Sequence, residues 1–458
     1  MKHPKKEKKT NGKLGILVGG GPAPGINGVI SASVIEAERN GINCTGFYEG
    51  FEGISLSKNP ERIELVTRHL ETGESSKEVS RVDVEGGSIL RTSRHNPSDK
   101  ELDRAIKTLI ELEIKYLITI GGDDTASSAS RLADRAKGKI RVAHVPKTID
   151  NDLPLPGDMP TFGYRTACEL GAKLVRNLMV DAATMPRWFI VVTMGRTAGH
   201  LALGIGKAAG ATLTIIPEDP EFGNSQNKIS ASLVCDIIES SIYKRLTLGR
   251  QDGVVVISEG VVLKLLKGEI EKLTGKTFLY DLHGHVKLGE FDMAPIWKSE
   301  IDKRLKRLKE KFNIAITTTA QNIGYPLRCQ TPGSFDREYI RELGFAAVRF
   351  VLGKTPYKNI SKINSAMVYI EHGNMRYSNF ADIRKIDPKT GKLRVQVRLV
   401  NINTQSYKVA REYMIRLEES DFTDESKLNS LAEVSKMSTK EFKKKFLHLV
   451  ANDSLYNI

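Results

Sequence analysis

Short apolar strands that end in polar, glycine-rich turns recur along this chain, and they constrain its fold more than any other feature. The first runs from Leu14 to Val18, enters Gly19-Gly20-Gly21, and is followed by a helical pattern from Ile26 to Arg39. Further short apolar strands that end in polar or glycine-containing turns are predicted at Tyr116–Ile120, Arg141–Val145, Trp188–Thr193 and Gly253–Ile257. Strands rich in Val and Ile that alternate with helices predict mostly parallel sheets covered on both faces. Ligands of such sheets bind outside the carboxyl ends of the strands, where the polar turns of this chain fall.

The length and composition predict a globular protein of two or three domains without a membrane segment. The chain has 458 residues, with 40% hydrophobic and 27% charged residues. No stretch approaches the roughly 18–20 consecutive apolar residues that span a bilayer, and no apolar segment follows the charged start. The cysteines, which have no metal-ligand spacing, are Cys44, Cys168, Cys235 and Cys329. Free thiols in a reducing compartment fit that pattern, so we expect a cytoplasmic protein without a membrane partner.

The net charge of +14 raises the question of a nucleic-acid partner. Much of the charge lies in residues 1–12, which we expect to be a disordered basic tail, and in short runs such as 303–307 and 440–445. Basic runs of this kind are usually solvated. The chain has no zinc-finger spacing and no RNA-binding aromatic signature, and a positive field also suits substrates that carry several phosphates. A nucleic-acid-binding protein is therefore an alternative that rests on charge alone, and we expect no such partner.

Two glycine-rich turns have the composition of phosphate sites. Gly19-Gly20-Gly21 lets a phosphate approach backbone N–H groups and the positive end of the following helix. It is not a P-loop, because no Gly-Lys-Ser/Thr follows, and a tight structural turn would use the same residues. In Gly121-Gly122-Asp123-Asp124 two carboxylates repel each other unless a cation is bound, and Mg²⁺ prefers one or two carboxylates with phosphate oxygens. Asp123 is the predicted ligand, and the alternative for one of the two aspartates is a helix cap.

A third turn, Asp150-Asn151-Asp152, follows Pro146-Lys147-Thr148 and supplies two more carboxylates. Phosphoryl transfer needs a metal-bound polyphosphate, an acceptor hydroxyl in line with it, and a base for the hydroxyl proton. Asp150 as the base, with Asp123 and Asp152 around Mg²⁺, would fill these roles. Taken alone, Asp-Asn-Asp is more often a turn.

Five motifs together carry a family resemblance. They are Gly121–Thr125 (GGDDT), Pro146–Asp152 (PKTIDND), Phe162–Ala167 (FGYRTA), Met194–Arg196 (MGR) and Ser258–Gly260 (SEG). In this order and spacing, from about Leu14 to Gly344, the chain resembles the phosphofructokinases. The resemblance implies two Rossmann-like three-layer α/β/α domains with mostly parallel sheets, an active site in the cleft between them, and a C-terminal extension. The expected parts are the tail at 1–12, a donor-binding domain at 13–162 completed by about 326–358, a fructose 6-phosphate domain at 163–325, and an extension of unknown role at 359–458.

The resemblance also implies a role for each matching residue. Asp150 corresponds to the general base for the sugar 1-hydroxyl, and Asp123 and Asp152 to Mg²⁺ ligands. The catalytic group is Asp150, Thr148, Lys147 and Asp124, and the donor phosphates would be contacted by Gly20, Gly21, Arg94, Gly122, Asp124 and Lys147. Fructose 6-phosphate would be contacted by Thr148, Asp150, Asp152, Met194, Gly195, Arg196 and Glu259, with Tyr325 and Arg328 on its 6-phosphate. Arg187 matches an arginine that reaches into a neighbouring subunit's site, which implies a homodimer or homotetramer with shared active sites.

Two positions bear on the phosphoryl donor. ATP-using relatives have glycine in place of Asp124 and commonly in place of Lys147. The side chain of Asp124 would point into the space of the ATP α-phosphate, and two like charges ~4 Å apart cost about 4 kcal/mol at an effective dielectric of about 20. Pyrophosphate ends before that point, and Lys147 could neutralise the phosphate that leaves. Aspartate and lysine at these two positions resemble the pyrophosphate-dependent branch of the family. The alternative is that Asp124 forms an ion pair with Lys147 and leaves room for ATP.

The expected reaction is Mg²⁺-dependent, reversible transfer from pyrophosphate to the 1-hydroxyl of fructose 6-phosphate, in glycolysis or gluconeogenesis. One alternative is an ATP-dependent 6-phosphofructokinase. Another is a non-catalytic regulatory subunit that binds phosphosugars, although such a subunit has no need for Asp123, Asp150 and Asp152 together. Sedoheptulose 7-phosphate is a further candidate acceptor. The sequence also departs from the family, because Thr319 stands where a basic residue is often found six positions before Tyr325, so one arm of the 6-phosphate grip is missing there.

Overall fold

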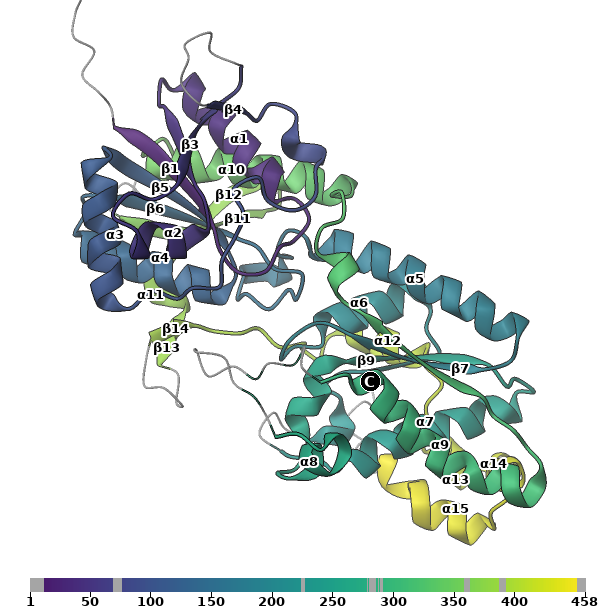
Figure 1. Ribbon diagram of the computed structural model, residues 1–458. Helices are drawn as coiled ribbons and strands as arrows, with labels where there is room; N and C mark the ends of the chain where they lie inside the picture. Colours follow the sequence, from purple (N-terminus) through teal and green to yellow (C-terminus); the bar gives the residue numbers. More distant parts are fainter. Residues whose placement is uncertain are drawn as a thin grey trace, which may run out of the picture. The chain divides into compact units, whose positions relative to one another are not determined.

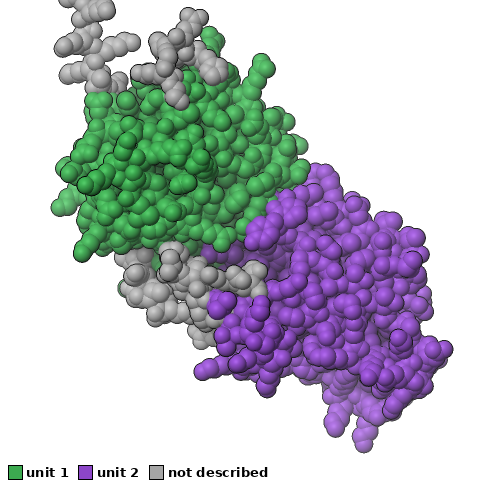
Figure 2. Space-filling view, viewed as in Figure 1, with its two compact units in different colours: residues 1–149, 153–167, 328–397 green, residues 150–152, 168–327, 398–458 purple. Residues whose placement is uncertain are grey.

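The computed structural model describes residues 12–68, 76–223, 227–277, 279, 286, 288, 291–357, 363–386 and 393–450. The chain forms two compact units, whose helices and strands are labelled in Figure 1 and which are coloured separately in Figure 2. Unit 1 comprises residues 1–149, 153–167 and 328–397, and unit 2 comprises residues 150–152, 168–327 and 398–458. The predicted tail at 1–12 lies outside the described residues except for its last residue.

The described part of unit 1 is built on an eight-stranded sheet with the order β12-β11-β6-β5-β1-β2-β3-β4 (Figure 1). The strands are β1 (Lys13–Val18), β2 (Cys44–Phe47), β3 (Arg62–Val66), β4 (Ser76–Glu78), β5 (Ile114–Gly121), β6 (Arg141–Pro146), β11 (Ser365–Glu371) and β12 (Asn374–Asn379). Neighbouring strands are parallel except for the pairs β2–β3 and β11–β12. Because β6, β5 and β1 are adjacent and parallel, the turns that follow them lie at one edge of the sheet.

Helices cover both faces of this sheet. They are α1 (Ile26–Arg39), α2 (Gly50–Leu56), α3 (Asp99–Glu111), α4 (Asp123–Ala136), α10 (Ser334–Val351) and α11 (Phe380–Ile383), with single 3₁₀ turns at Val82–Val84 and Pro156–Asp158 and a small hairpin of β13 (Arg384–Ile386) and β14 (Leu393–Val395). Ile16 of β1 packs with α1 and α10, whereas the next residue, Leu17, packs with α2, α3 and α4 on the opposite face. This alternation is expected of a strand buried on both faces, and it makes unit 1 a three-layer α/β/α structure.

The described part of unit 2 contains an all-parallel four-stranded sheet with the order β10-β7-β9-β8. The strands are β7 (Trp188–Thr193), β8 (Leu213–Ile215), β9 (Gly253–Ser258) and β10 (Thr318–Ile323). The helices are α5 (Tyr164–Thr184), α6 (His200–Ala209), α7 (Ala231–Thr247), α8 (Glu269–Thr274), α9 (Met293–Phe312), α12 (Gln405–Glu412), α13 (Ser420–Thr423), α14 (Glu425–Ser435) and α15 (Thr439–Phe446), with 3₁₀ turns at Pro220–Phe222, Glu259–Lys264, Tyr325–Leu327 and Leu447–Leu449. Trp188 of β7 and Trp297 of α9 are fully buried in its core.

The described residues of the C-terminal extension contribute to both units. Strands β11 and β12 enlarge the sheet of unit 1, with Met367 buried in its core. Helices α13 to α15 add Phe422, Phe442 and Phe446 to the core around Trp297 in unit 2. The region predicted as one extension at 359–458 is thus divided, and the chain passes from unit 1 to unit 2 between Val397 and Arg398.

Candidate active site

The glycine-rich turns of unit 1 lie together because β1, β5 and β6 are neighbours. The N–H of Gly19 donates to the carbonyl of Ile120 at 2.8 Å, and the N–H of Lys147 donates to the carbonyl of Gly121 at the same distance. The buried Lys147 extends its ammonium onto the carbonyl of Gly21. The predicted donor residues Gly20, Gly21, Gly122 and Lys147 are therefore gathered at one sheet edge.

Two arginines flank the glycine turn. A Cβ placed on Gly21 would lie 3.5 Å from Cζ of Arg328 and 3.6 Å from Nη2 of Arg94. The absent side chain leaves room between two guanidinium groups, which are the bidentate ligands of phosphate. Arg94 was predicted here. Arg328, which was predicted on the sugar 6-phosphate with Tyr325, also lies beside Gly21. Tyr325 is 70% exposed.

Asp123 and Asp124 form the first turn of α4, with Gly122 as the N-cap residue. Carboxylates are stabilised there by the helix dipole, so part of their placement is structural. The hydroxyl of Ser127, one turn on, donates to the carbonyl of Asp123 at 2.9 Å and accepts the N–H of Val395 at 3.2 Å. Strand β14 of the extension thereby braces the start of the helix that presents both aspartates.

His144 of β6 supports the same turn and was not singled out in the sequence. Its ring is fully buried between the Thr119 hydroxyl, 2.9 Å from Nδ1, and the carbonyl of Gly121, 3.1 Å from Nε2. Burial lowers the pKa of His144 to about 3. The ring is therefore neutral, and since a carbonyl only accepts, Nε2 carries the proton and Nδ1 accepts from Thr119. No local pattern distinguishes such a histidine from any other core residue.

The turn Asp150-Asn151-Asp152 is buried, with exposed fractions of 9%, 7% and 3%. Asn151 has a φ of 55°, in the left-handed region that asparagine tolerates better than most residues. Its carbonyl and its side-chain oxygen both accept from Nη2 of Arg398, at 3.1 and 2.8 Å. Thr148, two residues after the end of β6, is half-buried and accepts at its carbonyl from the Thr161 hydroxyl at 2.8 Å.

The predicted sugar-binding residues of unit 2 meet at the carboxyl ends of β7 and β9, which are adjacent strands. One oxygen of Glu259, Oε1, accepts the N–H groups of Gly195 and Arg196 at 3.1 and 2.8 Å. Met194 packs against Gly324, where a Cβ would lie 2.9 Å from its side chain. The carboxylate of Glu259 thus fixes the turn that carries Met194, Gly195 and Arg196.

Arg187 is not brought to this cluster. It precedes β7, so the whole six-residue strand separates it from Met194 at the other end. Its Nε lies 3.5 Å from Oδ1 of Asp181, and its guanidinium lies over the ring of Phe189. Within its own chain Arg187 is therefore at the amino end of the strand whose carboxyl end carries the predicted sugar site.

A buried ionic cluster holds the second part of the extension on unit 2. Arg416 contacts Asp219 at 2.7 Å and Glu221 at 2.9 Å, and Arg411 contacts Glu221 at 2.8 Å. Burial opposes ionisation of Glu221, but the two arginines outweigh it and keep the pKa of that carboxyl below its ordinary value. The Tyr407 hydroxyl completes the cluster by donating to Asp219 at 2.8 Å. These contacts are a structural anchor.

Glu218 links the extension to α6. Its Oε1 accepts the N–H of Gly199 and the N–H of Val400, both at 3.0 Å. Burial raises the pKa of Glu218 to about 7, the negative charge of Asp219 adds to this effect, and the two backbone N–H groups only partly oppose it. Glu218 therefore changes charge near neutral pH.

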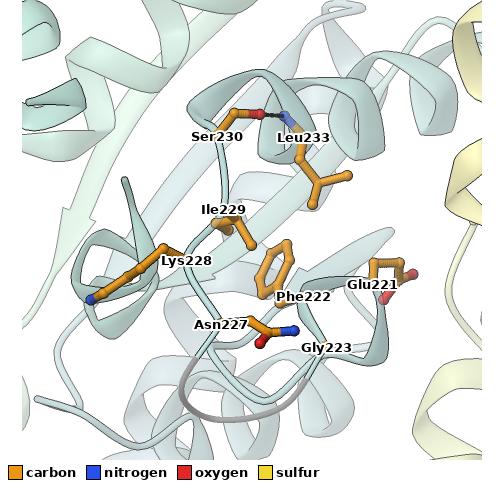
Figure 3. Close-up of a pocket in the computed structure, with 8 residues that line it drawn as sticks. All are labelled: Glu221, Phe222, Gly223, Asn227, Lys228, Ile229, Ser230 and Leu233. Carbon is orange, nitrogen blue, oxygen red and sulfur yellow. Dashed lines mark hydrogen bonds between the residues drawn. The ribbon is translucent and has the colours of Figure 1, made fainter. Parts of the chain in front are cut away.

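A cavity of about 430 Å³ in unit 2 involves none of the predicted site residues. It is lined by Glu221, Phe222, Gly223, Asn227, Lys228, Ile229, Ser230 and Leu233. Figure 3 shows Phe222 turned toward Ile229 and Asn227, whereas Lys228 points away from them. Lys228 donates to the carbonyl of Leu263, and Ser230 caps α7 through the N–H of Leu233 at 3.2 Å. The polar groups of this cavity thus serve local structure.

The carboxylates of the candidate site suit Mg²⁺ bound together with a phosphate, and not a metal held by protein alone. Within the described ranges no three His, Cys, Asp or Glu side chains gather as a metal cluster. Mg²⁺ needs only one or two carboxylates when phosphate oxygens and water complete its octahedron. Asp123 beside the glycine turns fits that requirement. None of the described helices is both long enough and apolar enough to cross a membrane.

The Phosphofructokinase family matches residues 13–351. This chain belongs to the phosphofructokinase family. A Thermotoga maritima protein named pyrophosphate–fructose 6-phosphate 1-phosphotransferase is 48% identical over 438 residues, covering 95% of this chain and 98% of its own. A Naegleria fowleri protein of the same name is 45% identical over 442 residues and covers 95% of each chain. The predicted family resemblance and the prediction of an enzyme are confirmed.

A solved family structure is also similar to this chain. The pyrophosphate-dependent phosphofructokinase from Marinobacter aquaeolei has a TM-score of 0.58 at 20% identity, covering 88% of this chain and 90% of its own. At that identity the likeness bears on the fold alone. It confirms the predicted α/β class with mostly parallel sheets.

Proposed function

We propose that this phosphofructokinase-family enzyme transfers a phosphoryl group from pyrophosphate to the 1-hydroxyl of fructose 6-phosphate, giving fructose 1,6-bisphosphate and phosphate. The observation that carries the donor assignment is that Lys147 directs its ammonium onto the Gly21 carbonyl, while Asp124 stands in the first turn of α4. The names of the relatives at 45–48% identity support the assignment. An ATP-dependent enzyme is the second candidate, because it would share every other residue of the site.

The charges around the glycine turn favour a short, highly charged donor. Lys147, Arg94 and Arg328 surround Gly21 and supply positive charge for two phosphates. Asp124 adds a negative charge where a longer nucleotide would continue. A like-charge contact at ~4 Å costs about 4 kcal/mol at an effective dielectric of about 20, or nearly three powers of ten in affinity.

In this proposal Asp150 is the general base. Asp150 accepts the proton of the sugar 1-hydroxyl while the hydroxyl oxygen bonds to the terminal phosphorus of pyrophosphate. The bond from that phosphorus to the bridging oxygen breaks, and the second phosphate leaves with the negative charge that Lys147 balances. Glu259 holds the turn at Arg196, which would contact the sugar phosphate. Since a phosphoanhydride is exchanged for a phosphate ester without a nucleotide, we expect the reaction to run in both directions.

Asp123 and Asp152 would hold Mg²⁺, which when bound neutralises charge on the donor phosphates. We further propose an oligomer with shared sites, a homodimer or homotetramer, in which Arg187 serves a neighbouring chain. The position of Arg187 at the amino end of β7 supports this, because its own chain keeps Met194 at the other end. We propose the cytoplasm as the place of action, in glycolysis or gluconeogenesis.

The test is a coupled assay of the purified enzyme with Mg²⁺ and fructose 6-phosphate, with pyrophosphate in one series and ATP in the other. Activity with pyrophosphate and none with ATP is the expected result. In Asp124→Gly the charge clash is removed, so ATP turnover should rise by about 10²–10³. Wild-type activity with ATP alone would exclude the donor assignment and leave the acceptor assignment standing. Binding of fructose 6-phosphate without turnover of either donor would favour a regulatory subunit.

A further inference from the structure

The loop that carries Asp150 and Asp152 is held from outside the family-matched region, by Arg398 of the C-terminal extension. The backbone N–H of Arg398 donates to the carbonyl of Asp152 at 2.6 Å. Its guanidinium donates to Asn151 through Nη2, at 3.1 Å to the carbonyl and 2.8 Å to Oδ1, and Nε lies 3.4 Å from the same carbonyl. One arginine therefore binds two consecutive residues of the loop by both main chain and side chain.

These contacts meet the loop at its conformationally costly point. Asn151 has a φ of 55°, in the left-handed region, which asparagine tolerates better than most residues but which still benefits from contacts that hold it there. The flanking residues, Asp150 and Asp152, are buried, so a change at Asn151 would reorient two carboxylates that have little room to adapt. A guanidinium can bridge the carbonyl and Oδ1 of one asparagine at once, because its N–H groups form a rigid planar fork.

Arg398 is itself fixed on unit 2. Its carbonyl accepts from Nε2 of His200, the first residue of α6, at 3.1 Å. Two residues later, the N–H of Val400 donates to Glu218, which also accepts the N–H of Gly199. The segment 398–400 is thus tied to the start of α6 on one side and to the loop on the other, so it connects the aspartates to a rigid element.

From this arrangement we infer that Arg398 is a positioning residue for phosphoryl transfer, which keeps Asp150 and Asp152 in their working orientation by holding Asn151 in the left-handed conformation. The inference rests on the proposed function, in which these two aspartates act on the acceptor hydroxyl and the metal. It gives the second part of the extension a role in the reaction. A misplacement of catalytic groups by ~1 Å can cost about 10² in rate.

The test compares Arg398→Ala, Arg398→Lys and the control Arg307→Ala in the full-length enzyme. Arg307 also donates to backbone carbonyls of the extension, those of Ser435 and Lys436, but it contacts none of the predicted site residues through these bonds. For each variant kcat and both KM values are measured, normalised to the folded fraction. Hydrogen exchange of peptides that span residues 148–153 is followed in parallel.

We expect kcat of Arg398→Ala to fall by about 10–100-fold, KM for fructose 6-phosphate to stay within about threefold, and the loop amides to exchange faster. Arg398→Lys should recover part of kcat, because one ammonium replaces one of the two contacts. Arg307→Ala should keep its kcat within about twofold of wild type whatever its thermal stability. Unchanged kcat and loop exchange in Arg398→Ala, or equal losses in the control, would overturn the inference. If the wild type turns over no donor, the proposed function fails, and loop exchange alone still decides whether Arg398 holds the loop.

Discussion

Replacing Glu218 with glutamine should change how the stability of unit 2 depends on pH. Burial is the main reason that the pKa of Glu218 rises from 4.5 to about 7, with the neighbouring Asp219 as a smaller cause in the same direction. The N–H groups of Gly199 and Val400 oppose the rise without cancelling it. Lys264, which also faces Glu218, is partly desolvated, and burial lowers its own pKa.

Whether the stability rises or falls with pH follows from the ionisation of Glu218 in the folded and in the unfolded chain. Below pH ~4.5 the carboxyl is protonated in both states, so its contribution to stability is fully present. Between pH 4.5 and about 7 only the unfolded chain ionises, and stability falls as the pH rises. The difference of 2.5 pH units, at ~1.4 kcal/mol each, makes the loss about 3 kcal/mol once the pH exceeds 7. The glutamine side chain of Glu218→Gln cannot ionise, so this variant should not lose this contribution to stability as the pH rises.

The assay is urea unfolding of the full-length enzyme at half-unit steps from pH 4.5 to 8, for wild type, Glu218→Gln and the exposed control Glu271→Gln. Unfolding of unit 2 is followed by the fluorescence of Trp188 and Trp297, both of which lie in its core. Glutamine places an amide group at the position of Oε2, an atom that is buried and makes no hydrogen bond within the described structure. We therefore expect the free energy of unfolding of Glu218→Gln to differ from that of wild type by a constant amount at every pH, in addition to the pH-dependent difference. The difference between wild type and Glu218→Gln should then grow by about 3 kcal/mol in favour of the variant as the pH rises. A difference that stays flat over this range would refute the reasoning, as would an equal trend in the control.

Three further outcomes are expected. Asp150→Asn should lower turnover by about 10²–10⁴ while leaving fructose 6-phosphate binding within a few-fold, measured by steady-state kinetics and calorimetry; undiminished turnover would remove Asp150 from the reaction. Arg416→Ala leaves Asp219 and Glu221 buried without their main counter-charge and should cost about 3–5 kcal/mol of unfolding free energy in urea, whereas a loss below ~1 kcal/mol would mean that the cluster is solvated. His144, with its pKa lowered to about 3, should show ring NMR shifts that do not move between pH 5 and 8, and a titration near pH 6.5 would contradict its burial.

The local elements of this protein could be predicted from the sequence because their signals are local. Hydrophobic runs and glycine turns located β7 at Trp188–Thr193 and α1 at Ile26–Arg39, and the structure has both at those residues. Helix α4 begins at Asp123, three residues before the predicted Ala126, since aspartates are favoured in the first turn of a helix. The motif residues at strand ends were also identifiable, because parallel strands bring their carboxyl ends to one edge.

What the sequence alone determined is therefore the α/β class, the strand-end motifs and the family. Only the tertiary structure decided that Arg398 binds Asn151, that Arg328 lies beside Gly21, and that the extension divides between the two units. Arg398 and Asn151 are 247 residues apart, and an arginine in an irregular segment has no periodic or compositional mark that names its partner. Such contacts arise when the chain has already packed, so they are visible in the folded protein and have no local signal in the sequence.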